Sequence, residues 1–93
     1  MERRLGFVGI IIEDRQAAAP RVNEILTRYG ERIVARTGLP YAPRGCCVIT
    51  LIVDATTDEI GELTGRLGQL PGVSVKSALS RRSGAPAVSG APS

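Results

Sequence analysis

The chain has 93 residues, enough for one domain and too few for two. Apolar residues make up 43% of it and aromatic residues only 3%, so the core must be aliphatic. The net charge is +3, but residues 5–80 hold eight basic and eight acidic residues, and the positive excess lies at the ends. A neutral body with few aromatic side chains lacks the face that nucleic acids bind, so we expect no direct nucleic-acid partner.

No membrane or secretion signal is expected from the apolar runs. None approaches the ~20 residues of a membrane helix, and residues 7–12 are too few for the apolar region of a signal peptide. Two cysteines do not make a disulfide framework, which fits a reducing compartment. We therefore expect a cytoplasmic protein without membrane association.

The first half of the chain predicts a strand, a helix and a short strand. Residues 5–14, LGFVGIIIED, are isoleucine-rich and end in charge, as strands often do. Residues 15–30 have apolar side chains at helical spacing. Pro20 is tolerated best in a first turn, so we expect the regular helix to begin near residue 18 or 19. Residues 31–36, ERIVAR, predict the short strand.

The second half repeats this plan after a connection. Residues 37–45, TGLPYAPRG, contain two prolines and two glycines and predict a long loop. Residues 46–54, CCVITLIVD, predict a second long strand. Residues 56–70 predict a helix that begins with Thr56 and Glu59 at capping-box spacing, and a last strand follows in residues 71–79.

The order of elements is β-α-β-β-α-β. It predicts an α+β, ferredoxin-like sandwich, with a four-stranded antiparallel sheet and two helices on one face. We expect a single domain over residues 1–80. Residues 81–93 are rich in Ser, Gly, Ala and Pro, which predicts a disordered tail.

The sheet face without helices is predicted to be apolar. A half-solvated sheet alternates apolar and polar residues, and the two long strands do not. We therefore expect a homodimer or homotetramer that forms through the sheet, either by stacking of this face or by extension edge to edge. The alternative is a face that is only solvated and somewhat apolar. The interface residues expected here are Phe7, Ile11, Cys46, Val48 and Ile52.

The residue types exclude much catalytic chemistry. The chain has no histidine, which excludes Ser-His-Asp and Cys-His pairs and histidine-bearing metal sites. Adjacent strand residues point to opposite faces, so Cys46 and Cys47 cannot bind one metal together. We expect Cys47 in the core, no resident metal or cofactor, and no enzyme activity.

Two segments are candidates for binding a small ligand. Asp14, Arg15 and Gln16 follow the first strand, and Tyr41 and Arg44 lie in the predicted 37–45 loop. Loops on a rigid sheet often carry function. For Asp14 the alternative is a helix N-cap, and for Tyr41 and Arg44 it is an ordinary solvated loop.

Residues 4–80 resemble the small family of iron-only hydrogenase system regulators. The segments that carry the resemblance most specifically are RTGLPY, TTDEIGELTGRLG and LPGVSVKS. The resemblance implies an ACT-like fold, also related to the C-terminal domain of the nickel-responsive repressor. It further implies a transcriptional regulator associated with iron-only hydrogenase maturation that forms oligomers through its sheet. As further partners we expect a small-molecule effector or another protein.

Two departures limit what the resemblance implies. The nickel repressor binds its metal through histidines, which this chain lacks. We also expect no ribbon-helix-helix segment before residue 5, and so no DNA binding by that module. By analogy with ACT domains, a ligand would lie at Asp14, Arg15 and Gln16 against a neighbouring subunit. One alternative function is a redox or metal sensor at an interface that uses Cys46. Another is an acylphosphatase-like enzyme, for which Arg15 is present but Asn23 is out of place.

Overall fold

The computed structural model describes residues 2–81. Three strands and a helix in the order expected form its first part: β1 (Arg4–Ile12), α1 (Arg15–Arg28), β2 (Ile33–Tyr41) and β3 (Cys46–Ala55). The helix α2 (Thr57–Gly68) and the strand β4 (Val73–Leu79) complete it. Short 3-10 turns at Gly30–Arg32 and Ala42–Arg44 flank β2. All but the first residue of the tail expected at 81–93 lies outside the described residues.

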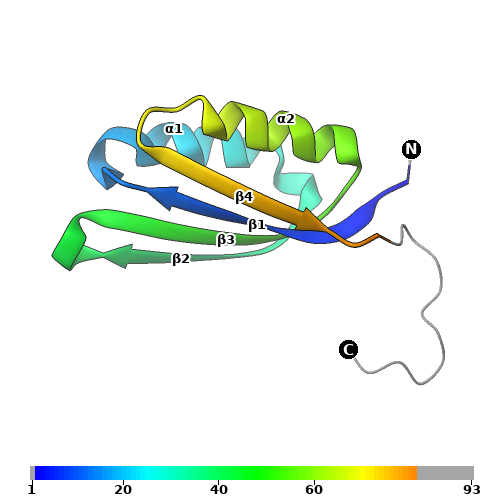
Figure 1. Cartoon of the computed structure of the whole chain (residues 1–93), viewed down its shortest axis with the longest axis horizontal. Helices are drawn as coiled ribbons and strands as arrows, with labels where there is room; N and C mark the ends of the chain where they lie inside the picture. The colour runs from blue at the N-terminus through cyan, green and yellow to red at the C-terminus, as the bar shows by residue number, and fades with distance from the viewer. Residues whose placement is uncertain (1, 82–93) are drawn as a thin grey trace, which may run out of the picture.

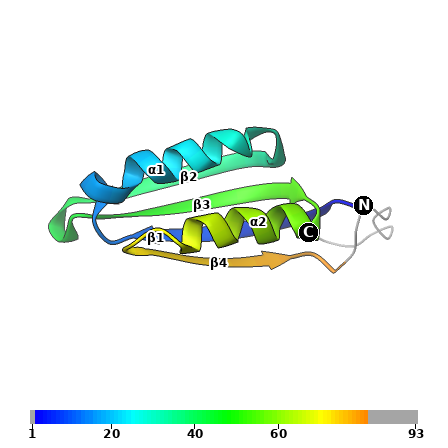
Figure 2. The ribbon, with the colours of Figure 1, turned by 90° about the horizontal axis from the view of Figure 1, so that it is seen from above.

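The four strands form one antiparallel sheet in the order β2-β3-β1-β4. Both helices lie on the same face of this sheet, side by side, as Figures 1 and 2 show. This is the ferredoxin-like sandwich that the element order predicts, and it confirms the fold class. Neither helix in residues 2–81 has the length and apolar character needed to cross a membrane.

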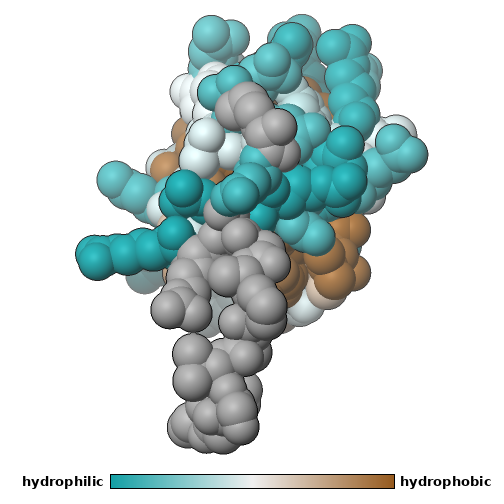
Figure 3. All heavy atoms as spheres, turned by 90° about the vertical axis from the view of Figure 1, so that its right-hand side faces the viewer, coloured by the Kyte–Doolittle hydropathy of each residue, from teal (hydrophilic) through white to brown (hydrophobic). Residues whose placement is uncertain are grey.

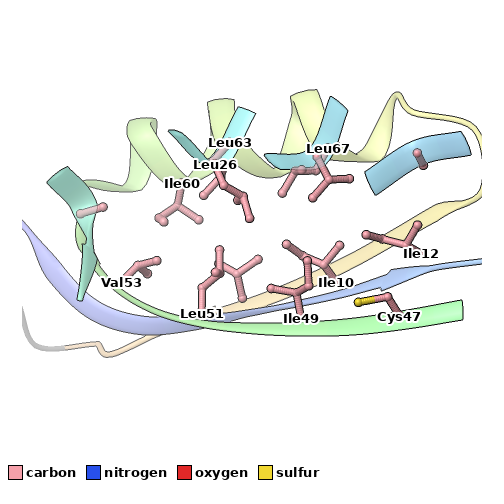
Figure 4. Packing of buried hydrophobic residues seen from close by; sticks show 14 residues of the cluster. Ile10, Ile12, Leu26, Cys47, Ile49, Leu51, Val53, Ile60, Leu63 and Leu67 are labelled. Carbon is pink, nitrogen blue, oxygen red and sulfur yellow. The ribbon is translucent and has the colours of Figure 1, made fainter. Parts of the chain in front are cut away.

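The core fills the space between the sheet and the helices and is aliphatic, as the composition requires. Alternate residues of the paired central strands point into it; for example, Ile10 pairs with Ile49 and Val8 with Leu51. From above, Leu26 of α1 and Leu63 and Leu67 of α2 close over them (Figure 4). No polar or charged side chain among the described residues is buried.

The strand β2 is longer than the sequence predicts. Residues 37–41 continue it to Tyr41, where the sequence predicts a loop, and only residues 42–45 form the turn to β3. The prediction was wrong because β2 is an edge strand. Pro40 has no N–H to donate, but an edge strand pairs with a neighbour on one side only and tolerates this loss. Gly45 closes the turn with a left-handed φ of 65°.

The helix α1 also begins earlier than predicted, at Arg15. The Asp14 side chain caps it, since one of its oxygens accepts a hydrogen bond from the Ala17 N–H at 3.3 Å. Pro20 lies in the second turn and is exposed. It removes one hydrogen bond of the helix, and the cap together with the buried side chains of Val22 and Leu26 outweighs that loss.

The start of α2 combines a capping box with an ion pair. Thr56 Oγ1 accepts from the Glu59 N–H at 3.1 Å, and a Glu59 carboxylate oxygen accepts from the Thr56 N–H at 2.9 Å. The other Glu59 oxygen lies 2.7 Å from Nε of Arg32, which follows α1. The hydrogen bonds from Thr56 and Arg32 lower the pKa of Glu59 to about 2.

We predict that Glu59→Gln changes how stability depends on pH. The folded pKa of Glu59 lies below its usual 4.5, so its stabilising contribution is complete above pH 4.5 and is lost as pH falls toward 2. Glutamine keeps the capping box but has no charge for Arg32. Urea unfolding should therefore separate the variant from the wild type at pH 7, and the difference should shrink by pH 2.5. Asp58→Asn, in the same turn, is the matched control; a constant difference across this range for Glu59→Gln would contradict the prediction.

Candidate functional site

Three connections meet at one end of the sheet. The turn from β1 to α1 is bound to both of the others through the backbone. The Glu13 N–H donates to the Gly72 carbonyl at 2.8 Å, in the turn before β4, and the Arg15 N–H donates to the Gly45 carbonyl at 3.3 Å, in the turn before β3. Gly72 has a φ of 73°, which glycine adopts without strain. These bonds hold the start of α1 against the β2–β3 turn.

An open hollow of about 290 Å³ lies between the start of α1 and the β2–β3 turn. Its lining residues come from both sides: Asp14, Arg15, Gln16, Tyr41, Ala42, Gly45 and Cys46. The structure thus brings together Asp14, Arg15, Gln16 and Tyr41, four of the five residues that the sequence suggests for a ligand. Arg44, the fifth, belongs to the turn but does not line the hollow. Their role in binding stays a prediction.

The side chains around the hollow can bind a polar molecule. Asp14 supplies a carboxylate, one oxygen of which caps α1. Within residues 2–81 the side chains of Arg15, Gln16 and Tyr41 make no hydrogen bond or ion pair with another side chain, so they can donate to a ligand. A guanidinium beside a carboxylate suits a ligand that carries both signs of charge or an acidic group with a donor next to it.

The second candidate surface is the sheet face opposite the helices, here called the open face. We define it by its seven large apolar side chains, which are 38% to 60% exposed: Leu5, Phe7 and Ile11 of β1, Leu39 and Tyr41 of β2, and Val48 and Ile52 of β3. Figure 3 shows apolar atoms gathered at the lower right, toward the side on which Figure 1 places the sheet. All five residues that the sequence suggests for an interface lie on this face, Cys46 among them.

Sequence reasoning missed Leu39 and Tyr41 as parts of this face, because it assigned both to a loop. The register of β2 places Leu39 opposite Val48 and Tyr41 opposite Cys46. The alternation of Ala35, Thr37, Leu39 and Tyr41 could have indicated a strand, but Pro40 and the glycines obscured it.

The two cysteines point to opposite faces, as expected for neighbours on a strand. Cys47 is buried with Ile49 and Ile12 in the core (Figure 4), which confirms the prediction for it. Cys46 is half-buried on the open face, and both thiols are free. Within the described part of the chain no three acidic or cysteine side chains are grouped as metal ligands would be.

Comparisons with known proteins agree with this fold. The profile of the family described as "TM1266-like: Iron-only hydrogenase system regulator, putative" matches residues 4–77. The solved structure of the uncharacterized protein TM1266 from Thermotoga maritima superposes with a TM-score of 0.81 and 38% identity, over 84% of this chain and 98% of that one. No curated protein matches the chain significantly.

A more distant likeness exists to CPII, a nitrogen regulatory PII-like protein from Thiomonas intermedia K12 whose structure holds ADP, AMP and bicarbonate. It has a TM-score of 0.47 and 20% identity, over 85% of this chain and 92% of that one. A likeness at that level carries no argument about ligand or assembly. The matched segment and the identity to TM1266 are decisive instead: this chain belongs to the TM1266-like family of iron-only hydrogenase system regulators.

Proposed function

We propose that this protein is a non-enzymatic, cytoplasmic regulatory module of an iron-only hydrogenase system, associated with hydrogenase maturation. In this proposal it assembles through its open face and binds a small polar effector between subunits. One observation carries the proposal: Tyr41 and Cys46 line the hollow and also lie on the open face. A ligand in the hollow would therefore touch the surface through which the chain assembles.

The size of the open face supports assembly. Its seven large apolar residues are 38% to 60% exposed and lie on neighbouring strands of one face. A contiguous apolar patch of this kind marks an interaction site, whereas single scattered apolar residues do not. A second copy of the chain is the partner proposed, because it presents the same open face. Packing the two open faces together covers both apolar surfaces.

Assembly is tested by sedimentation velocity at protein concentrations between about 1 and 100 µM, which span the dissociation constants of moderately stable complexes. The wild type should sediment as a dimer or tetramer. Ile52→Arg, which puts a charge at the middle of the open face, should sediment as a monomer with unchanged helix content. Glu24→Arg, on the exposed side of α1, is the matched control and should assemble like the wild type. A monomeric wild type at 100 µM would refute the assembly.

Effector binding is tested by thermal shift with a panel of amino acids and nucleotides. A ligand of the hollow should raise the melting temperature of the wild type, and Arg15→Ala should abolish that shift because the guanidinium is the main group for an acidic ligand. Arg66→Ala, at the end of α2, is the control and should keep the shift. If no compound moves the wild type, the effector part of the proposal fails and the assembly part stands.

A second candidate function is a redox or metal sensor at the subunit interface, and the place of Cys46 favours it. The thiol is free, half-buried and on both candidate surfaces. Metal analysis of protein purified without oxygen, together with sedimentation of Cys46→Ser, distinguishes the two functions. A metal-free protein whose assembly ignores this substitution leaves the effector-binding module as the function.

A further inference from the structure

The open face carries a hollow of its own at the middle of β1. It has a volume of about 310 Å³ and lies beside Gly9, between Phe7 on the same strand and Thr50, Lys76, Ser77 and Ala78 on the flanking strands. Gly9 pairs with Thr50 of β3 and Lys76 of β4. Because glycine has no side chain, Gly9 leaves a gap between the apolar side chains of Phe7 and Ile11 on the same face of β1.

Within residues 2–81, nothing requires glycine at this position. A Cβ added to Gly9 would meet only the Lys76 carbonyl oxygen, at 4.0 Å, and Gly9 has no positive φ. Gly6 on the same strand is different, since its Cβ would collide with the Ala78 carbonyl oxygen. A glycine inside a strand costs roughly 0.5–1 kcal/mol relative to alanine, and one that its own fold does not need marks a place where something else approaches closely.

Phe7 stands at the rim of this hollow and is the only phenylalanine of the chain. It lies two residues before Gly9, so both belong to the same face of β1, and Phe7 is 45% exposed. An exposed aromatic residue beside a cavity on one face can be self-complementary. Two copies related by a two-fold axis can each insert the ring into the other's cavity.

We propose that two copies of the chain pack open face to open face, with Phe7 of each copy seated in the Gly9 hollow of the other. The two-fold axis lies midway between the two sheets, runs perpendicular to β1 and passes over Val8, which places residue 7 of one copy over residue 9 of the other. The sheets then stack at the usual ~10 Å separation of a sandwich. This inference rests on the proposed assembly and names its central contact.

The Lys76 ammonium, the one cation among the described residues that line the hollow, is compatible with this contact. Lys76 lies on β4, which is an edge strand, so its ammonium can reach solvent at the side of the stacked sheets while its methylene groups lie along the apolar surface. The ring of the partner would then lie against the Lys76 stem, where an aromatic face is a favourable neighbour for a cation.

The test is a double-mutant cycle on the dissociation constant of the dimer, measured by sedimentation equilibrium. Gly9→Val fills the hollow and Phe7→Ala removes the ring, and each should weaken association by about tenfold to hundredfold, as overpacking and lost packing do in cores. The double variant restores part of the volume, so it should associate more tightly than the product of the two single effects predicts. Gly61→Ala, on the exposed side of α2 with open space around it, is the control and should leave association unchanged.

The outcomes separate this inference from the proposed function. Urea unfolding at a concentration where the chain is monomeric checks that Gly9→Val folds; Gly9→Ala replaces it if it does not. If a wild-type dimer forms and neither substitution weakens it, or the two effects simply multiply, the Phe7–Gly9 contact is overturned and the assembly stands. If the wild type is a monomer, both are overturned, and the open face serves another protein or an apolar ligand.

Discussion

Leu51→Ala should lower the free energy of unfolding by about 2–5 kcal/mol, the range for buried leucines cut to alanine. Leu51 is fully buried in the middle of β3, opposite Val8, and lies under the helices (Figure 4). The neighbours can fill the space only in part, because the interior is close-packed and relaxes incompletely around a cavity. A small domain has about 5–15 kcal/mol of stability in total, so this variant should lose a large part of it. Urea unfolding monitored by circular dichroism measures the loss.

Ile52→Ala is the matched control, because the next residue points to the opposite face. Its side chain is 38% exposed, so at a concentration where the chain is monomeric the loss should be far smaller than for Leu51→Ala. The two variants should differ in a second way: raising the protein concentration should separate Ile52→Ala from the wild type if the open face is an interface. Equal losses for both variants in dilute solution would show that the assignment of faces is wrong.

Gly6→Ala should destabilise the chain by about 1–3 kcal/mol or more, the range for overpacking. The added methyl group would collide with the Ala78 carbonyl oxygen and with the Leu79 side chain, both on β4. A backbone oxygen cannot move aside as a flexible side chain can, so β4 would have to shift away from β1. Hydrogen exchange should therefore show lower protection of β4 amides, together with an earlier urea midpoint.

Gly9→Ala on the same strand is the matched control for Gly6→Ala. Its methyl group would have no neighbour nearer than 4.0 Å, so in dilute solution the chain should be as stable as the wild type or slightly more so. If both substitutions destabilise the chain equally, the collision with β4 is not the cause.

The candidate site was predictable in part. Asp14, Arg15 and Gln16 follow a predicted strand, and the fold brings them against Tyr41 across the β2–β3 turn. Arg44 could not be excluded from the sequence, because the direction of a side chain in a four-residue turn depends on the backbone angles of the turn, which the sequence does not show. The extent of β2 was not predictable either. Pro40 ends a central strand but is tolerated in an edge strand, and which strand is the edge is a property of the sheet.

The glycines illustrate the same division. The sequence shows Gly6 and Gly9 only as two breaks in an isoleucine-rich strand. The structure shows that Gly6 has to be glycine, because a side chain there would collide with β4. It also shows that Gly9 leaves a hollow on the open face. No pattern in the chain distinguishes them, because the distinction lies in the neighbouring strand.

By itself, the sequence determined the order of elements, the aliphatic core, the capping box of α2 and the opposite directions of Cys46 and Cys47. These depend on periodicity and on residues close together in the chain, whose physics is local. Only the tertiary structure decided the length of β2, the convergence of two turns into the hollow at Asp14 and Tyr41, and the breadth of the open face across β1, β2 and β3. Those features depend on which strands are neighbours and in what register, and this is set by pairing between residues far apart in the chain.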